Sequence, residues 1–183
     1  MLRKQRGFTL VEVIVVAGII AILAGILVPL ILKEIDEARI TRSYADVRSM
    51  STSIVVFRKD TGKWPNLNGG CTATVSFVFG EGALPSGLAA QGYDQTTSVS
   101  LDDYLAIDGT GCYGARWKGP YLAHTSADPW GNAYFINAGN FAGGAVWILS
   151  AGPNGTIETP AGAPVLQGDD VGIMVFRSTV ILE

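Results

Sequence analysis

A single uninterrupted apolar run dominates the pattern of this chain. Residues 13–32 contain no charged side chain, and about 20 apolar residues in a helix span the roughly 30 Å hydrocarbon core of a bilayer. Three basic residues, Arg3, Lys4 and Arg6, precede the run, and acidic residues follow it. The positive-inside tendency therefore predicts one membrane pass that leaves Met1 in the cytoplasm. A cleaved secretory signal fits less well, because its apolar segment is only about 7–15 residues long.

The helix is expected to continue beyond the apolar run. Charged residues arrive together at residues 33–39 without any turn signal, and apolar residues then recur at intervals of three and four, as on a helix that packs against a domain. These stripe residues are Ile40, Tyr44, Val47, Met50, Ile54 and Phe57. Gly62 ends the pattern, so we expect one helix over about residues 11–59. Pro29 lies inside it and predicts a kink or local melting at residues 25–29.

Strand patterns dominate the second half of the chain. Residues 134–136 and 145–150 are β-rich runs, and the glycine-rich segment between them predicts an antiparallel pair. Residues 72–79 alternate like another strand, residues 101–107 suit one or two helical turns, and the apolar tail at residues 173–182 predicts a further strand. The pattern therefore predicts an α+β protein in which a long helix packs on a small antiparallel sheet.

Composition narrows the classes of function. The chain has 183 residues, enough for one domain beyond the membrane segment, and its 13 basic against 16 acidic residues argue against nucleic-acid binding. His124 is the only histidine, no metal-ligand spacing surrounds it, and the sequence lacks a phosphate-cradling Gly-Lys motif and a nucleophile elbow. Asp102 and Asp103 suit the start of a helix. We therefore do not expect an enzyme.

Two cysteines, Cys71 and Cys112, lie on the exported side of the membrane pass, where disulfides form. A bridge between them would close a long loop, which is worth about 4 kcal/mol by the chain-entropy relation. Two unpaired buried thiols are the alternative.

The start of the apolar run resembles a known processing signal. Residues 6–12, RGFTLVE, are similar to the signal of the type IV pilin and pseudopilin family. The resemblance implies that a prepilin peptidase removes residues 1–7 by cutting after Gly7, that Phe8 becomes the N-methylated mature terminus, and that the hydrophobic helix is kept. Pro29 also falls where the family commonly has a helix-kinking proline.

Glu12 is a carboxylate at the edge of the apolar run, and it allows two interpretations. A bare carboxylate in hydrocarbon is costly, so such a residue is normally paired. The α-amine that cleavage exposes on Phe8, in the same or in a neighbouring subunit, is the available partner, and pairing between subunits would make assembly relieve a defect of the monomer. Alternatively, Thr9 and Glu12 form a capping box at the helix start. The two interpretations can coexist.

Three downstream segments narrow the resemblance. DTGKWP at residues 60–65, GPYL at residues 119–122 and DPWGNAY at residues 128–134 closely resemble the major pseudopilins of type II secretion systems. Trp130 is expected to anchor the core beneath the turn that precedes the strands. Residues 66–118 have no close counterpart in the family, and we interpret them as a variable insert that the two cysteines pin.

The resemblance also implies a cation site. In the family, segments that correspond to SAGPNG at residues 150–155 and GDDVG at residues 168–172 carry a calcium-binding loop. A structural Ca²⁺ held by Asn154, Asp169 and Asp170 with nearby carbonyl oxygens is therefore expected, although Asn154 stands where an aspartate is usual. Solvated turn residues without a cation are the alternative.

The chain is accordingly identified as pilin-like and α+β, with a removed leader (residues 1–7), a membrane-spanning and assembly segment (8–32) and a periplasmic head (33–183) that comprises the outer half of the helix (33–60), the insert (66–118) and a C-terminal sheet (119–183). The resemblance implies a structural subunit of a type II secretion pseudopilus, anchored in the inner membrane by a single pass. It would assemble with copies of itself, with other pseudopilins and with the inner-membrane assembly platform into a periplasmic or cell-surface filament. A major or minor type IV pilus pilin and a membrane-anchored periplasmic binding module are the alternatives.

Overall fold

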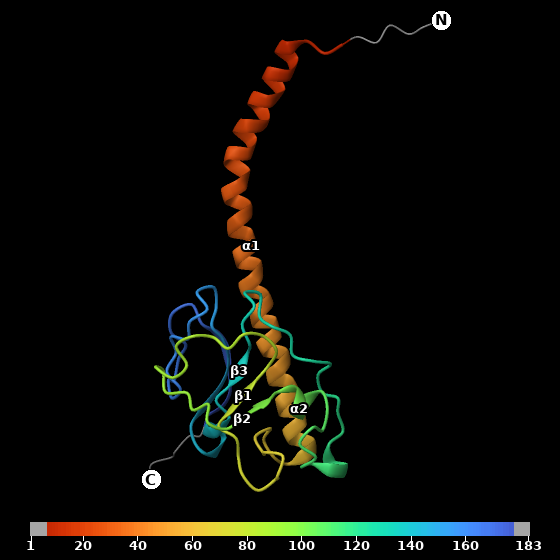
Figure 1. Cartoon of the computed structure of the whole chain (residues 1–183), viewed down its shortest axis with the longest axis vertical. Coiled ribbons are helices and arrows are strands. Elements are labelled where there is room, and N and C mark those ends of the chain that lie inside the picture. The colour runs from red at the N-terminus through yellow and green to blue at the C-terminus, as the bar shows by residue number, and fades with distance from the viewer. Residues whose placement is uncertain (1–6, 178–183) are drawn as a thin grey trace, which may run out of the picture. The chain divides into compact units, whose positions relative to one another are not determined.

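A long helix is the first element of the computed structural model, which describes residues 7–177. Helix α1 (Leu10–Thr61, 52 residues) confirms the predicted helix and extends it slightly at both ends (Figure 1). The helix is unbroken at Pro29, so local melting, one of the two outcomes expected there, does not occur, and a kink at Pro29 stays a prediction. Most of the predicted leader, and the end of the last predicted strand at residues 178–182, lie outside the described residues.

The chain forms two compact units, residues 1–39 and residues 40–183. In the first unit every described residue is exposed. The second unit holds the outer part of α1 and all of the described strands. The apolar core therefore belongs to the second unit.

Within residues 7–177, five strands form a single mixed sheet. Its order is β2-β1-β3-β4-β5, and the strands are β1 (Phe77–Phe79), β2 (Ser98–Ser100), β3 (Phe135–Ile136), β4 (Ala145–Ser150) and β5 (Val171–Arg177). The antiparallel β3–β4 pair confirms the predicted pairing. β1 and β2 pair in parallel, which corrects the expectation of a wholly antiparallel sheet, because the chain crosses over between them instead of turning tightly. Only the last part of the strand expected at residues 72–79 enters the sheet.

Three short helical segments complete the described chain, namely α2 (Asp102–Leu105), η1 (Gly114–Arg116) and η2 (Ala138–Ala142). α2 confirms the helical turn expected at residues 101–107, and it has Asp102 and Asp103 in its first turn. η2 lies in the connection between β3 and β4.

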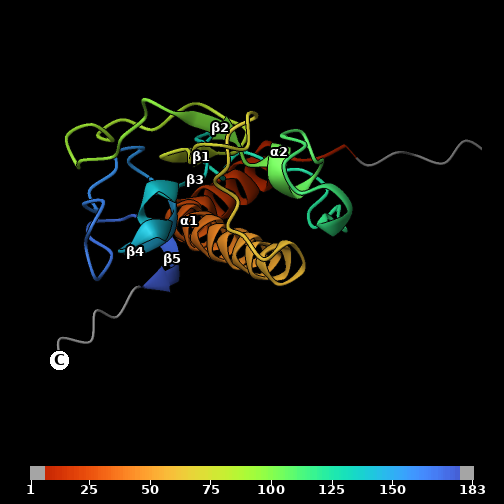
Figure 2. The same cartoon turned by 90° about the horizontal axis from the view of Figure 1, so that it is seen from below.

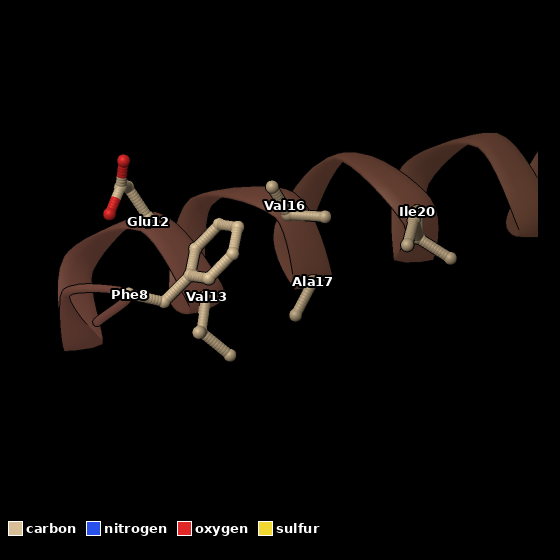
Figure 3. Close-up of a pocket in the computed structure, with 6 residues that line it drawn as sticks. All are labelled: Phe8, Glu12, Val13, Val16, Ala17 and Ile20. Carbon is tan, nitrogen blue, oxygen red and sulfur yellow. The ribbon is translucent and has the colours of Figure 1, made fainter. Parts of the chain in front are cut away.

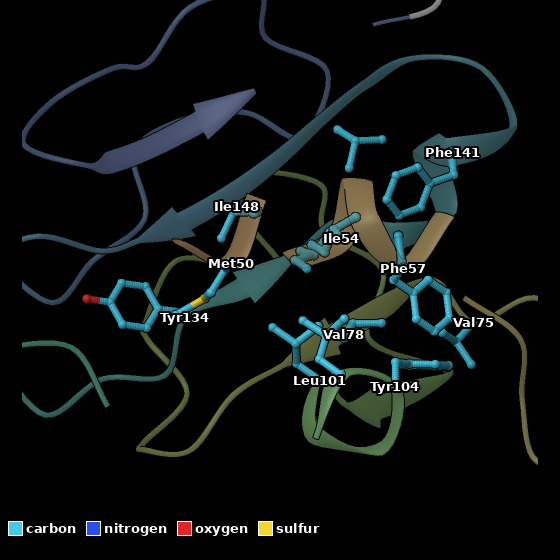
Figure 4. Close-up of a cluster of buried hydrophobic side chains, with 14 of the residues drawn as sticks. Met50, Ile54, Phe57, Val75, Val78, Leu101, Tyr104, Tyr134, Phe141 and Ile148 are labelled. Atoms are coloured by element: carbon cyan, nitrogen blue, oxygen red, sulfur yellow. The ribbon is translucent and has the colours of Figure 1, made fainter. Parts of the chain in front are cut away.

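The outer part of α1 packs against one face of the sheet, and the strands lie along one side of the helix in Figure 2. The stripe residues that are buried as predicted are Val47, Met50, Ile54 and Phe57. They share one apolar cluster with alternate residues of the strands, namely Val78, Ile136, Val146 and Ile148 (Figure 4). Tyr44 is half exposed, so its place in the predicted stripe is wrong. Ser43, one position earlier, is buried instead and contacts the hydroxyl of Tyr134.

The opposite face of the sheet carries a second apolar core. Successive residues of a strand point to opposite faces, and those that point away from α1 gather with side chains from loops. The strand residues are Phe77, Phe135, Trp147 and Leu149, and the loop residues include Leu88, Tyr93 and Ile157. The sheet is thus covered on both faces, which explains why all 6 residues of β4 are buried.

Candidate functional site

The first turn of α1 joins Thr9 and Glu12 in a capping box. The backbone N–H and the hydroxyl of Thr9 both donate to Glu12 Oε2 at 2.9 Å, and the N–H of Glu12 donates to the Thr9 hydroxyl at 3.3 Å. One of the two interpretations of Glu12 is therefore present in this structure. Gly7 and Phe8 lie before the helix and are exposed in the described chain.

An exposed apolar surface follows the capping box along α1. A shallow groove at its start is lined by Phe8, Glu12, Val13, Val16, Ala17 and Ile20 (Figure 3). Between residues 10 and 32 the large apolar side chains are 48% to 74% exposed. Leaving apolar surface in water is unfavourable by about 25 cal/mol per Å², and the helix is long and apolar enough to cross a membrane. Lipid or other helices can cover this surface.

Asp128 organises the turn that precedes β3. Its buried carboxylate accepts hydrogen bonds from the N–H groups of Trp130 and Asn132, at 3.0 and 2.8 Å, and from the Ser150 hydroxyl at 2.6 Å. Trp130 is only partly buried and belongs to neither apolar core, which corrects its expected role as a core anchor. The signal that could have found Asp128 is its position at the start of a turn, where aspartate accepts bonds from the following N–H groups.

Tyr134 connects the sheet to α1 through a polar contact that the apolar pattern does not predict. Its buried hydroxyl donates to Asp46 Oδ2 at 3.0 Å and lies 3.4 Å from Ser43 Oγ. Burial raises the pKa of the Tyr134 phenol, which therefore stays a neutral donor. Arg42 Nε lies 3.6 Å from the same carboxylate oxygen of Asp46. Polar contacts thus help to set the position of the helix on the sheet within the second unit.

The loop between β4 and β5 contains the predicted cation ligands. Asp170 Oδ2 accepts the N–H groups of Glu158 and Thr159 at 3.0 and 2.7 Å, and burial raises the pKa of the Asp170 carboxyl. Asp169 Oδ2 accepts the N–H of Asn154 at 3.1 Å. The other oxygen of each aspartate, Oδ1, is buried and has no hydrogen-bond partner in the described chain.

Two buried carboxylate oxygens without partners, on neighbouring residues, suit a hard cation that prefers oxygen ligands. The third predicted ligand is already engaged, because Asn154 Oδ1 accepts the N–H of Thr156 at 2.6 Å. Among residues 7–177, no group of three or more His, Cys, Asp or Glu side chains is arranged to hold a metal. Backbone carbonyls and water would therefore have to complete the coordination of a cation held by the two aspartates.

The segment at residues 66–118 is tied to the rest of the second unit. Cys71 and Cys112 form the predicted disulfide, with their Cα atoms 5.3 Å apart, so the alternative of two free thiols is wrong. Tyr104, from α2 in this segment, is fully buried against Phe57 of α1. The segment therefore supplies part of the core. His124 is exposed in a loop outside it.

Two known protein families match separate parts of this chain. Residues 2–28 match the family described as a prokaryotic N-terminal methylation motif. Residues 96–165 match the family described as type II secretion system (T2SS), protein G, and this match begins inside the segment that we interpret as an insert. No solved structure matches the chain significantly.

Curated relatives extend the similarity over most of the chain. Type II secretion system core protein G of Escherichia coli K12 is 31% identical over 157 residues, which are 85% of this chain and 87% of that protein. The proteins of the same name in Pseudomonas aeruginosa and Vibrio cholerae are 28% and 26% identical, over 72% and 86% of this chain and 72% and 79% of their own lengths. With the helix, the sheet and the N-terminal signal in place, these similarities show that the chain belongs to the type II secretion system core protein G family of major pseudopilins.

Proposed function

We propose that this chain is the structural subunit of a type II secretion pseudopilus and assembles through residues 8–32. The observation that carries the proposal is the exposed apolar surface of α1, which no other described part of the chain covers. Membership of the core protein G family supports the same role. The relatives are named as a core protein of a secretion system, so the proposed role is structural and involves no catalytic reaction.

The proposed mechanism uses the same helix in two environments. Before assembly, residues 8–32 cross the inner membrane, and the head lies in the periplasm. A prepilin peptidase then cuts after Gly7 and leaves a charged α-amine on Phe8. In the filament, lipid is replaced by the helices of neighbouring subunits in a helical array that does not close. Glu12 of one subunit pairs there with the α-amine of a neighbour, so that neither charge is left unpaired in an apolar surrounding.

The partners follow from this mechanism. The chain would contact copies of itself and other pseudopilins in the filament, the peptidase during processing, and the inner-membrane assembly platform during extension. The test is a deletion strain complemented with the intact gene. The proposal predicts that deletion abolishes secretion of the exported proteins and that complementation restores it. Loss of surface pili with normal secretion would favour a type IV pilus pilin, and loss of neither would favour a membrane-anchored binding module.

We also propose that the loop between β4 and β5 binds a structural Ca²⁺ through Asp169 and Asp170. Support comes from their buried Oδ1 atoms, which otherwise lack partners. A divalent cation bound by both residues would give these oxygens a partner and offset the negative charge of the loop. Asn154 contributes less than a carboxylate would, since its side-chain oxygen already accepts a backbone hydrogen bond.

A further inference from the structure

Asn154 and Gly155 form an Asn-Gly pair whose geometry suits a spontaneous covalent change. We propose that Asn154 is a deamidation site, at which the side-chain amide becomes a carboxylate in the folded protein. The reaction requires a backbone nitrogen without steric cover, a side-chain carbonyl carbon beside that nitrogen, and access for water. The loop between β4 and β5 meets each requirement.

The side chain of Asn154 is folded back over its own following peptide. Its Oδ1 accepts the N–H of Thr156 at 2.6 Å, which makes an Asx turn. Because the oxygen lies over the residue two positions ahead, the carbonyl carbon, Cγ, lies beside the intervening nitrogen of Gly155. The same hydrogen bond draws electron density from the carbonyl and makes Cγ more electrophilic.

Gly155 leaves its nitrogen accessible. It has no side chain to hinder approach, and its φ of +67° is a backbone conformation that favours glycine. Asn154 is exposed, so water reaches the amide. The contact that opposes attack is weak, because the N–H of Gly155 donates to the Gly152 carbonyl at 3.3 Å, beyond the usual range for such a bond.

The reaction needs no partner other than water. The nitrogen of Gly155 gives up its proton to solvent and attacks Cγ of Asn154. A carbon–nitrogen bond forms, the carbon–nitrogen bond of the side-chain amide breaks, and ammonia leaves with a proton taken from water. Water then opens the resulting five-membered ring at either carbonyl and gives aspartate or isoaspartate. The balance is one water consumed and one ammonia released.

The product changes the charge of an already acidic loop. Asn154 contacts Asp169 directly through its backbone N–H, and Glu158 and Asp170 lie in the same hydrogen-bonded loop. Deamidation therefore adds a negative charge to a loop that already holds the carboxylates of Glu158, Asp169 and Asp170.

The chain contains an internal control with the same dipeptide. Asn68 is followed by Gly69, but its Oδ1 faces the N–H of Ala73 at 3.4 Å and makes no bond to the residue two positions ahead. Its backbone is held in a turn, in which the carbonyl of Asn68 accepts the N–H of Cys71 at 2.9 Å. Asn68 should therefore deamidate more slowly than Asn154 in the folded chain.

The test follows both asparagines in one sample. The full-length chain in detergent micelles is incubated at neutral pH, and aliquots are digested briefly in water labelled with heavy oxygen, which marks deamidation during digestion. Tandem mass spectrometry then measures the acid fraction at each site. A second sample is reduced, alkylated and denatured before incubation, and an Asn154→Gln variant shows which signal belongs to Asn154.

We expect Asn154 to deamidate several-fold faster than Asn68 in the folded chain, and the two rates to converge in the denatured chain. The Asn154→Gln variant should lose the fast component. Equal rates in the folded chain, or a faster reaction at Asn68, would overturn the proposal.

Discussion

At the scale of single residues, Asp128 stabilises the turn before β3 through its side-chain hydrogen bonds. Its carboxylate accepts two backbone N–H groups and one hydroxyl, and it is buried. A buried donor that loses its acceptor keeps the full cost of leaving water, which is about 1–3 kcal/mol. The turn should therefore be more sensitive to loss of the Asp128 carboxylate than to loss of the Ser150 hydroxyl.

We predict that Asp128→Ala destabilises the chain by about 3 kcal/mol, because it leaves two backbone N–H groups without an acceptor. Ser150→Ala is the matched comparison and should cost less, about 2 kcal/mol. It removes the bond that the hydroxyl donates to Asp128 and the 3.2 Å bond that it accepts from the N–H of Gly152, but it leaves the two backbone bonds of Asp128 in place. Chemical denaturation of the full chain in detergent micelles measures both. Equal losses for the two variants would contradict the role of Asp128.

At the scale of elements, α1 carries two surfaces with different functions. From residue 10 to residue 32 it is apolar and exposed, whereas from Ser43 to Thr61 only one stripe is buried against the sheet. Neighbouring positions on this outer part therefore have very different surroundings. Ile54 is 0% exposed, and Val55 is 52% exposed.

We predict that Ile54→Ala lowers the free energy of unfolding by about 2–5 kcal/mol, because it opens a cavity between α1 and the sheet. Val55→Ala should change it by less than about 0.5 kcal/mol, as for an exposed position. Both variants add an alanine to the same helix, so differences in helix propensity are small beside the cavity effect. A large loss for Val55→Ala would mean that the opposite side of α1 is also covered.

At the scale of the whole molecule, the sheet depends on loops as much as on α1. One face packs against the helix, and the other packs against Leu88, Tyr93 and Ile157 from loops. Ile157 precedes Glu158, whose N–H donates to the proposed cation ligand Asp170. Order in the acidic loop should therefore affect the second core.

We predict that millimolar Ca²⁺ raises the thermal midpoint of the full chain and that a chelator reverses the change. Ligand binding to the folded state alone stabilises it by about 2.7 kcal/mol at a ligand concentration of 100 times Kd. Asp169→Asn should abolish the response, while Asp94→Asn, at an exposed aspartate that bonds Thr96, should keep it. An unchanged thermal midpoint of the unmodified chain in Ca²⁺ would contradict the proposed cation site.

The features of the fold that have strong local signals are predictable from the sequence. The stripe at Val47 to Phe57 has the period of a helix, and the β3–β4 pair has apolar runs on both sides of a glycine-rich turn. The second core is not predictable in this way, because Leu88 and Tyr93 lie in a loop that has no periodicity. The parallel pairing of β1 with β2 is equally hidden, because 3-residue strands show almost no alternation. The large side chain of Trp130 suggests burial, whereas the turn is stabilised by hydrogen bonds to Asp128.

The candidate site is also predictable only in part. Glu12 is recognisable in the sequence because a carboxylate rarely borders an apolar run. Its capping bonds with Thr9 follow from the spacing of the two residues. The contact of Tyr134 with Asp46 joins residues far apart in the chain, and no local pattern reports it.

The central claim is that Glu12 acts between subunits as well as capping its own helix, and co-expression tests it most directly. Wild-type chain is produced together with Glu12→Ala, Glu12→Gln or Thr9→Ala, and the share of the variant is compared between purified filaments and membranes. We predict that both Glu12 variants are depleted from filaments, because they lack the charge, whereas Thr9→Ala enters them because its carboxylate remains. Glu12→Ala subunits that enter filaments as well as wild type would contradict the claim.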